Sequence, residues 1–527
     1  MAEKKILIFG NDAREKLLRG MEVVERAVSS TLGPRSRNVS VDYNSLGDRP
    51  PLILHDGVSV ARSIDLEDPF EDQGARLIKD AALRSNQVAG DGTTTATILA
   101  LAIVKEAHKN IQAGANPMQL RGEIETAVKK VVEELKSMSK DVSDPKEIEQ
   151  VATISAGSPE IGKMVAEVIN RVGHDGVVTI EKGNGIKDEV EYKQGLEVDR
   201  GYLSSHFVNN SSTVEAIIDD PYILLTDKKL NYGYDIVPLL QKLAKAQIKN
   251  LVIFAGEVVE EALATLVINK MRGAFNIVAI QAPAYGERRV DELNDLAVLT
   301  GATPILISEG RSLDTVEVEE LGRAERVKSD RDKTIVIKGG GNKELLVQRL
   351  EDLKKQVESA NTDYDREIKK KRMAQLSGSI AVINVGGLTS VEVDEKYERI
   401  NDAVNATKAA LDEGVVAGGA ITLMEVTKKA FWDEFPTTGA KILREAFLVP
   451  FRRLMENSGF DYSEIREKMS GRKYPYGVDV FDGQIKDLIK SGVIDPVKVI
   501  RSSLENAASV AVLTLTTECL VVFKNDK

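Results

Sequence analysis

The 527-residue sequence contains a single cysteine, Cys519. A chain of this size without paired cysteines has no disulfide framework, which suits a reducing compartment. The N-terminus also lacks the long apolar core of a secretory signal peptide. No uninterrupted apolar run reaches the ~18 residues that a membrane span requires. These absences predict a cytoplasmic protein with no membrane partner.

Histidine and excess positive charge are scarce as well. The four histidines are scattered and have no cysteine neighbours, so a structural zinc site is not expected. Asp and Glu number 82 against 71 Lys and Arg, a net charge of -11, so a nucleic-acid partner is not expected either. Composition is otherwise that of a globular protein, and the length predicts about three domains.

The stretch with the clearest chemistry is Ala89–Thr95, with the sequence AGDGTTT, which an apolar run to Val104 follows. A run that is apolar on all sides predicts a buried helix, whose start offers unpaired N–H groups and a positive dipole end. Glycines admit phosphate close to the backbone, hydroxyls bond its oxygens, and Asp91 is a natural Mg²⁺ ligand beside it. The plain alternative is a helix N-cap with spare threonines, but the combination favours a nucleotide-phosphate site.

Helical periodicity is strong in the N-terminal part. An amphipathic helix is predicted over 11–32, with Asp12 and Glu15 resembling a capping box. It ends at the Thr-Leu-Gly-Pro turn of 31–34. A second helix with a long apolar stripe is predicted to begin at Asn116-Pro117.

A hairpin and a candidate domain joint are also predicted here. Residues 39–43 alternate like a strand, and 51–54 follow as a possible partner. Asp56 then lies in a turn, where a lone aspartate is more often a turn former than a catalyst. The Pro-containing stretch 139–145 indicates a joint between domains.

The pattern of predicted secondary structure changes between residues 195 and 377, and the new pattern predicts an α/β domain. Short apolar strands alternate there with helices, at 251–255, 277–281, 304–308 and 334–337. The glycine-rich 339–343 lacks the Lys-Ser/Thr ending of a phosphate loop and is interpreted as a turn before a charged helical pair over 343–376. After 378 the chain is mostly helical, with a glycine-rich break at 414–420, until an apolar strand at 519–523.

One helix of this insert has more apolar surface than packing requires. Apolar residues between Val258 and Met271 cover roughly two-thirds of the helix circumference, whereas one packed face needs about a third. The excess predicts a second apolar face for a partner. Complete burial of the helix is the alternative, and the interleaved Glu257, Glu260 and Glu261 argue against it.

Several long motifs, in order along nearly the whole chain, resemble the group I, bacterial-type 60-kDa chaperonins, the GroEL family. The matching stretches are 9–14, 31–34, 56–61, 90–95, 199–204, 261–273, 413–419 and 516–519. The resemblance implies the chaperonin fold, mainly α with an α/β insert. The implied domains are an equatorial ATP-binding domain (1–137 and 413–527), an intermediate hinge domain (138–194 and 379–412) and an apical domain that binds unfolded protein (195–378).

The resemblance also implies the roles of the ATP-site residues. Asp91 matches the Mg²⁺ ligand, Asp402 the residue that positions the attacking water, and Asp56 a second carboxylate beside the γ-phosphate. The remaining nucleotide positions implied by the resemblance are Thr31, Leu32, Gly33, Pro34, His55, Gly92, Thr93, Thr94, Thr95, Gly419, Asp479 and Asp495. A monovalent cation, K⁺, is expected near the backbone of His55.

The family further implies the partners of the chain. Unfolded proteins are expected to bind an apical groove lined by Tyr202, Ser204, Phe207, Val237, Leu240, Leu263, Val267 and Ile268. The insert lacks extra sequence for a built-in lid, so a separate ring-shaped, GroES-like co-chaperonin is implied. The subunit is expected to form a homo-oligomer, a heptameric ring, in which the strand at 519–523 joins the hairpin of the neighbouring subunit. The alternative is that this strand pairs within its own chain.

Four departures from the family pattern affect these expectations. His55 replaces a lysine near the phosphates, and Arg35-Ser36 replace Lys-Gly after the Gly-Pro turn. Residues 478–481 replace the family's asparagine and alanines, which puts adenine contacts there in doubt, and His206 replaces a groove tyrosine.

Three hypotheses about function follow: an ATP-driven folding chamber, an ATP-dependent metabolic enzyme, and a scaffold whose ATPase has decayed. Retention of Asp56, Asp91 and Asp402 argues against the last.

Overall fold

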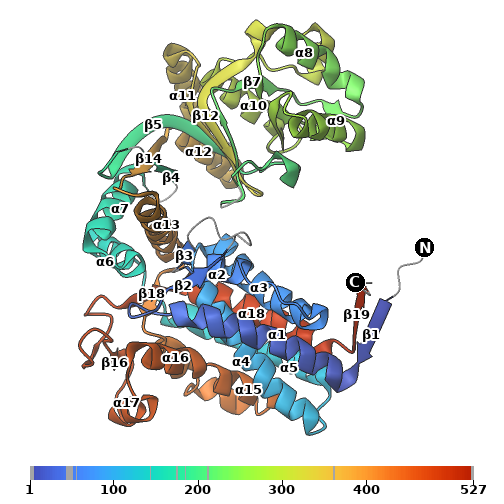
Figure 1. Cartoon of the computed structure of the whole chain (residues 1–527). Coiled ribbons are helices and arrows are strands. Elements are labelled where there is room, and N and C mark those ends of the chain that lie inside the picture. The colour runs from blue at the N-terminus through green and yellow to red at the C-terminus, as the bar shows by residue number, and fades with distance from the viewer. Residues whose placement is uncertain are drawn as a thin grey trace. The chain divides into compact units, whose positions relative to one another are not determined.

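The computed structural model describes residues 5–42, 52–54, 56–142, 144–173, 176–183, 185–210, 213–359 and 362–523. The chain divides into two compact units (Figure 1). The helical unit comprises Met1–Asn170 and Gly387–Lys527, and the α/β unit comprises Arg171–Gly386. A helical part built from both chain ends, interrupted by an α/β insert, is therefore confirmed. The three-way division into equatorial, intermediate and apical domains stays a prediction.

The helical unit is organised around one buried helix, α4 (Thr93–Gln112), as the apolar run predicts. Ala96, Ile98, Leu99 and Ile103 are almost completely excluded from solvent. The long helices packed around it are α1 (Gly10–Val28), α3 (Pro69–Ala89) and α18 (Val497–Thr516), while α5 (Pro117–Met138) packs against α18. Asn116 caps α5 through its side chain, so the predicted start of that helix is confirmed.

The remaining helices complete the two units. In the helical unit they are α2 (Gly57–Arg62), α6 (Pro145–Ala156), α13 (Ser390–Glu413), α14 (Ile421–Val426), α15 (Thr438–Ala446), α16 (Val449–Ser458) and α17 (Tyr462–Lys468). Helix α7 (Pro159–Val172) runs to the boundary with the α/β unit. That unit contains α8 (Gly233–Lys245), α9 (Glu260–Met271), α10 (Glu287–Thr300), α11 (Lys343–Glu358) and α12 (Asp363–Ser377). No described helix is long and apolar enough to cross a membrane.

Small two-stranded sheets connect distant parts of the helical unit. The predicted hairpin is confirmed as β2 (Val39–Val41) paired with β3 (Leu52–Leu54), while Tyr43 and Pro51 lie outside the described residues. The C-terminal strand β19 (Cys519–Phe523) pairs antiparallel with β1 (Lys5–Phe9) of the same chain. The sequence analysis did not predict β1, although the apolar run from Ile6 to Phe9 could have indicated it. The other pairs are β15 (Val415–Ala417) with β18 (Ile494–Pro496), and β16 (Tyr476–Val478) with β17 (Ile485–Asp487).

The α/β unit contains one large mixed sheet, in the order β11-β9-β7-β12-β13-β5-β14-β4, with β6 also paired to β12. Its parallel part is formed by β7 (Tyr222–Leu225), β9 (Asn250–Ala255) and β11 (Asn276–Gln281). The other strands are β4 (Val178–Lys182), β5 (Glu189–Val198), β6 (Ala216–Asp219), β12 (Gly322–Ser329), β13 (Thr334–Gly339) and β14 (Ser379–Val385). In a separate short parallel pair, β8 (Lys229–Leu230) directly precedes α8 and β10 (Glu257–Val258) directly precedes α9.

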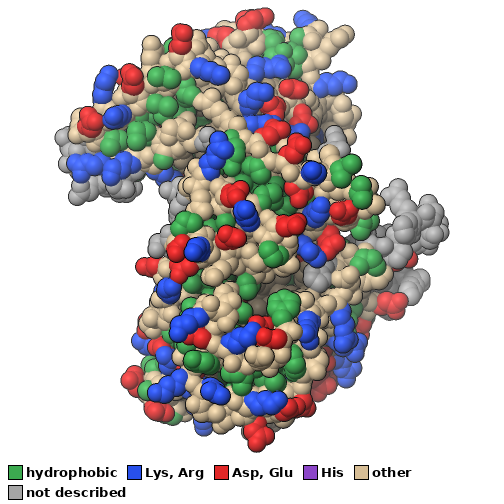
Figure 2. Space-filling model, turned by 90° about the vertical axis from the view of Figure 1, so that its left-hand side faces the viewer, with side chains coloured by type: hydrophobic (Ala, Val, Ile, Leu, Met, Phe, Trp, Pro, Cys, Tyr) green, Lys and Arg blue, Asp and Glu red, His purple; other side chains and the backbone are tan. Residues whose placement is uncertain are grey.

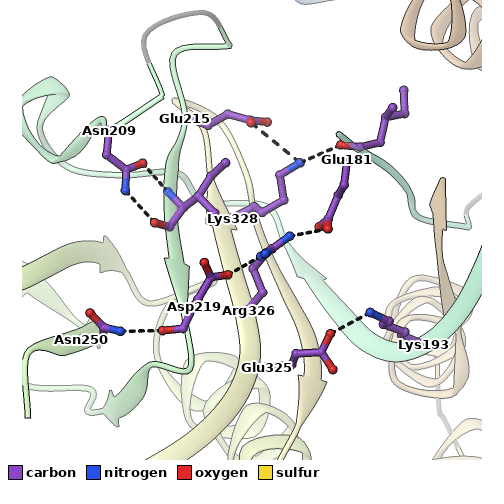
Figure 3. Close-up of polar contacts among 11 residues, drawn as sticks. Glu181, Lys193, Asn209, Glu215, Asp219, Asn250, Glu325, Arg326 and Lys328 are labelled. Atoms are coloured by element: carbon purple, nitrogen blue, oxygen red, sulfur yellow. Dashed lines mark hydrogen bonds and ion pairs between the residues drawn. The ribbon is translucent and has the colours of Figure 1, made fainter. Parts of the chain in front are cut away.

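Polar contacts join strands that are far apart in this sheet (Figure 3). Arg326 on β12 binds Glu181 on β4 and, at 2.5 Å, Asp219 on β6. Asn250 donates to the carbonyl of Asp219 at 2.7 Å. Since three strands separate β4 from β12 in the sheet order, the contact between Arg326 and Glu181 shows that the sheet curls and brings its β4 end close to β12. On the face drawn in Figure 2, acidic, basic and apolar side chains are interspersed.

Two sequence-based expectations are wrong in detail. The first helix ends at Val28, a 3₁₀ turn over Ser29–Thr31 follows, and no side chain caps its start, because β1 runs directly into it at Gly10. Asp12 is therefore inside the first turn rather than at the cap. Residues 304–308 form no strand, because only Ile305 makes a bridge, to Thr226, before a 3₁₀ turn begins at Ile307.

Helices α1 and α3 approach so closely that glycine is required where they meet. A Cβ atom on Gly20 would lie 1.8 Å from the carbonyl oxygen of Glu71, and one on Gly74 would lie 2.1 Å from that of Leu17. Both obstacles are backbone atoms of packed helices, which cannot rotate away as a side chain can. The two helices therefore hold each other's position through backbone contact.

Gly20→Ala should therefore destabilise the helical unit by about 1–3 kcal/mol, as overpacking of a core does. Gly122→Ala is the matched control, since a Cβ on this glycine of α5 meets nothing within 4 Å. The control should be neutral or stabilised by about 0.5–1 kcal/mol through helix propensity. Urea unfolding followed by circular dichroism measures both, and equal midpoints would refute the close-packing account.

Candidate functional site

The glycine-threonine stretch lies at the start of α4, where the sequence predicted it. Gly92 caps the helix with φ +84, and a Cβ there would lie 2.3 Å from the Ser503 Oγ and 2.8 Å from the Val499 Cγ1. Ser503 also donates to the Gly92 carbonyl at 2.9 Å. Because α18 holds the loop so closely, only glycine fits at this position. The first N–H groups of α4 are thereby presented at one fixed place.

A neighbouring glycine brings α13 to the same place. Gly90 ends α3 with φ +69, and a Cβ on it would lie 2.1 Å from the Asn405 Cβ. Asp402 lies three residues before Asn405, about one helical turn away and on the same side of α13. The loop between α3 and α4, which carries Asp91, is therefore next to the part of α13 that carries Asp402.

The Thr31–Pro34 loop contacts the start of α4 from another side. The hydroxyls of Thr31 and Thr94 lie 3.2 Å apart. Asn457, on α16, donates to the carbonyls of Ser29 (2.8 Å) and Leu32 (3.0 Å) and so fixes the loop. The loop is held between α4 and α16 and lines the predicted phosphate position.

Asp56 approaches the threonines through the adjacent glycine. Its carboxylate caps α2 by accepting from the Ser59 N–H at 2.7 Å. A Cβ on Gly57 would lie 2.5 Å from the Thr94 Oγ1 and 3.1 Å from the Thr93 Oγ1. Asp56 is thus both a turn former and a neighbour of the candidate phosphate site. His55 lies outside the described residues.

The carboxylates of Asp56, Asp91, Asp402 and Asp495, called here the aspartate cluster, act on one another electrostatically. Burial raises the pKa of Asp402 well above its ordinary value, and the charges of Asp91 and Asp56 add to it. Burial, with the charge of Asp56, also raises the pKa of Asp91, although the Gly92 N–H donates to that carboxylate and partly offsets the shift. Burial and the charge of Asp91 raise the pKa of Asp495 to about 7. Such convergence of negative groups favours a bound cation.

The donors available fit a magnesium–nucleotide complex better than a metal held by protein alone. Across the described ranges, no group of three or more His, Cys, Asp or Glu side chains is arranged to hold a metal ion. Mg²⁺ is usually bound by one or two carboxylates together with substrate phosphates and water. Asp91, beside the N–H groups and hydroxyls of Gly92–Thr95, matches that requirement.

At the predicted adenosine end, the structure groups Gly419 and Asp495. Asp495 lies on β18 opposite Val416 of β15. A Cβ on Gly418 would lie 2.9 Å from the Asp495 Oδ1, and Gly419 follows with φ +66. Asp479 instead stabilises the turn of the β16–β17 hairpin. Its carboxylate accepts from the Phe481 N–H at 3.0 Å and pairs with Lys486 at 3.0 Å. Its contact with a nucleotide stays a prediction.

The residues predicted for the client groove lie in the α/β unit at different depths. Helix α9 fully buries only Ala262 and Leu266, so the alternative of a completely buried helix is wrong. Ile268 is 46% exposed, while Tyr202, Ser204, Val237, Leu263 and Val267 are half-buried. Phe207 and Leu240 are 0% and 5% exposed, so these two side chains lie in the core. The groove assignment as a whole stays a prediction.

The sequence analysis missed the residues that hold the site in place: Ser503, Asn405 and Asn457. Each lies on a helix far along the chain from the loop that it contacts, and no local pattern marks it. Arg35 was noted only as a departure. It donates to the Phe481 carbonyl at 2.8 Å and so ties the 31–34 loop to the β16–β17 hairpin.

A helical unit built from both ends of the chain and carrying an inserted α/β unit is the architecture expected of a chaperonin. The sequence matches the TCP-1/cpn60 chaperonin family over residues 24–525, and the chain belongs to that family. Two solved structures of the chaperonin gp146 from the bacteriophage EL 2 (Pseudomonas aeruginosa), both in the presence of ATP-BeFx, have the same fold. Crystal form II has a TM-score of 0.70 at 21% identity, covering 99% of this chain and 100% of that one. Crystal form I has a TM-score of 0.64 at 21% identity, covering 98% and 99%.

The chaperonin fold predicted from the sequence is thus confirmed. Family membership makes the chain an ATP-dependent molecular chaperone with ATPase activity, which acts on unfolded proteins as an oligomeric ring. The alternative of a metabolic enzyme is wrong. The particular type of chaperonin and the residue roles are separate questions.

Stability should depend on pH through Asp495. Its pKa is about 7 in the folded chain, against roughly 3.9 in the unfolded chain. Between these values the folded state holds a proton that the unfolded state has lost, so stability falls as pH rises. Without nucleotide, the stability of Asp495→Asn relative to the wild type should therefore rise between pH 5 and pH 8, by on the order of 2 kcal/mol in the free energy of unfolding. Melting curves at both pH values measure this gain. Asp433→Asn, at an exposed aspartate, is the control, and an Asp495→Asn gain no larger than the control's would contradict the prediction.

Proposed function

We propose that this chain is a group I, bacterial-type (GroEL-family) chaperonin subunit whose aspartate cluster is the site of ATP hydrolysis. The observation that supports this most strongly is that burial first, and neighbouring carboxylates second, raise the pKa values of Asp91, Asp402 and Asp495 at the start of a buried helix. An uncompensated cluster of this kind is costly, and a Mg²⁺–nucleotide complex compensates it.

In the proposed site, Asp91 holds Mg²⁺, and Gly92–Thr95 bind the phosphates through N–H groups and hydroxyls. The Thr31–Pro34 loop lies along the nucleotide, while Gly419 and Asp495 face the adenosine end. Asp479 and a K⁺ ion near His55 are included in the proposed nucleotide site on the basis of the family resemblance alone. The bound Mg²⁺ supplies neutralisation of charge on the phosphate oxygens.

Asp402 has the catalytic role in this proposal. Burial first, and then the charges of Asp91 and Asp56, raise its pKa, which favours a protonated carboxyl that cannot act as a base. A cation held by Asp91 would remove part of that repulsion and favour the ionised form of Asp402, which could then accept a proton from the attacking water, while Asp56 helps to orient that water. Nucleotide binding would then switch on the base that hydrolyses it. Because α13 is predicted to belong to the intermediate hinge domain, its movement would couple hydrolysis to domain closure.

Assembly is proposed to use the two small sheets of the helical unit. Both β1–β19 and β2–β3 have only two strands in the described chain, and such sheets have outer edges that favour pairing. We propose that the β1–β19 sheet of one subunit pairs with the hairpin of the next, closing a heptameric ring. The pairing of β19 with β1 is compatible with this, since a strand has two edges.

The α/β unit is proposed to capture unfolded proteins on the exposed apolar side of α9, where apolar contact is non-directional and suits many clients. A separate GroES-like co-chaperonin is proposed to close the chamber. The proposed location is the cytoplasm.

Asp402→Ala should bind Mg·ATP nearly as the wild type does but hydrolyse it about 100-fold or more slowly, because water positioning is lost while the phosphate contacts remain. Asp91→Ala should weaken both Mg·ATP binding and turnover. Glu395→Gln, which changes an exposed carboxylate on the same helix, should alter neither. Single-turnover assays and nucleotide titrations separate the two effects. Hydrolysis by Asp402→Ala at the wild-type rate would refute the proposed role.

Leu263→Ser combined with Val267→Ser should weaken capture of a chemically unfolded client and docking of the co-chaperonin. Each change should cost about 1.5–3 kcal/mol if the partner buries the side chain fully. Leu345→Ser removes an exposed leucine from α11, outside the proposed groove, and is the matched control. Light scattering of an aggregating client measures capture. Undiminished protection by the double variant would rule out the groove.

A further inference from the structure

Two adjacent tyrosines at the start of α8 form an exposed aromatic surface. Tyr232 and Tyr234 are 47% and 69% exposed. Their rings are stacked, with centroids 5.0 Å apart and an interplanar angle of 18°. A stacked pair has one rigid outer face and little side-chain entropy left to lose on binding. Exposed aromatic pairs of this kind favour a partner.

Other tyrosines of the α/β unit already have a cationic partner from the chain. The guanidinium of Arg171 lies 3.8 Å from the ring centre of Tyr192, and that of Arg323 lies 3.9 Å from that of Tyr222. Arg289 approaches the exposed Tyr285 at 5.2 Å. For Tyr232 and Tyr234, the part of the chain that is described supplies no such cation. Their outer faces are therefore open to a cation from another molecule.

Carboxylates lie beside the tyrosine pair without a basic partner. Glu261 accepts from the Gly233 N–H at 3.4 Å, and Asp235 accepts from the Tyr232 N–H at 3.0 Å. Within the described ranges, neither carboxylate forms an ion pair. Desolvation raises the pKa of the Tyr234 hydroxyl first, and the charges of Asp235 and Glu261 raise it further. The aromatic surface thus lies in a negative environment.

The face of α9 that carries Glu261 also carries an exposed apolar side chain, Ile268. Glu261, Thr265 and Ile268 are spaced four and then three residues apart, so they lie on one face of α9. A Cβ on Gly233 would lie 2.9 Å from the Thr265 Oγ1, which places this face against the tyrosine pair. Of the nearby cations, Lys229 pairs with Glu257, Lys270 binds Asn276, and Arg272 lies about one turn beyond Ile268. Tyr232, Tyr234, Glu261 and Ile268 therefore form one surface, called here the tyrosine patch.

We propose that the tyrosine patch binds an arginine or lysine side chain of an extended, unfolded client segment, together with an apolar residue next to it. The cation lies over the exposed ring of Tyr234 and pairs with Glu261, while the apolar side chain contacts Ile268. This inference rests on the proposed capture of unfolded proteins by the α/β unit and adds a preference to it. A client region that is both basic and apolar would be held more tightly than one that is only apolar.

The test uses two fluorescent 12-residue peptides of alternating leucine and polar residues, titrated with the full-length assembled protein. One carries arginines, and the other carries citrulline, which has the same shape without the charge. The wild type should bind the arginine peptide about fivefold more tightly at low salt. The preference should shrink as added salt screens the exposed pair. Tyr234→Leu and Glu261→Gln should each reduce the ratio toward one while circular dichroism stays unchanged.

Tyr285→Leu, at an exposed tyrosine that Arg289 already covers, is the matched control and should keep the preference. Equal affinity of the wild type for both peptides would overturn the tyrosine patch and leave client capture intact. If neither peptide bound, client capture itself would fail along with the patch. Leu263→Ser with Val267→Ser should weaken both peptides alike. A preference that survives Tyr234→Leu and Glu261→Gln would show that the cation binds elsewhere and would also overturn the proposal.

Discussion

Burial of Asp91, Asp402 and Asp495 near other carboxylates is the constraint on which the candidate site of the helical unit depends. Negative groups gathered beside the start of a buried helix are tolerated only if many of them stay protonated or a cation joins them. The surrounding packing keeps the carboxylates together despite this cost. Gly92 admits α18, Gly90 admits α13, and the β15–β18 pair presents Asp495. In the proposed site, a cation bound by Asp91 would reduce this electrostatic cost.

The α/β insert meets a different requirement. It is a folded unit with its own core, so its surface can remain partly apolar without weakening the nucleotide site. Arg326 links the β4 end of the curled sheet to β12, and α9 packs beside β11 of the same sheet. A rigid base with exposed apolar and aromatic side chains suits a partner that brings no defined shape of its own.

Local patterns in the sequence predicted a large part of this architecture. The apolar run after Thr95 identified α4, Asn116-Pro117 identified the start of α5, and the alternation at 39–43 identified β2. Prediction failed where distant contacts decide the outcome. The Asp12 capping box is replaced by direct entry from β1, whose partner β19 lies at the other end of the chain. Similarly, the family resemblance places Phe207 in the surface groove, but tertiary packing buries its side chain completely.

The most direct test of the aspartate cluster as the nucleotide site is the proton balance on binding preformed Mg·ADP. Calorimetry in buffers of different ionisation enthalpy counts the protons released. Because Asp495 has a pKa of about 7 and those of Asp91 and Asp402 are also raised, binding near pH 6.5 should release protons, and the release should fall at higher pH. Binding with no proton release at either pH, or with proton uptake, would contradict the account.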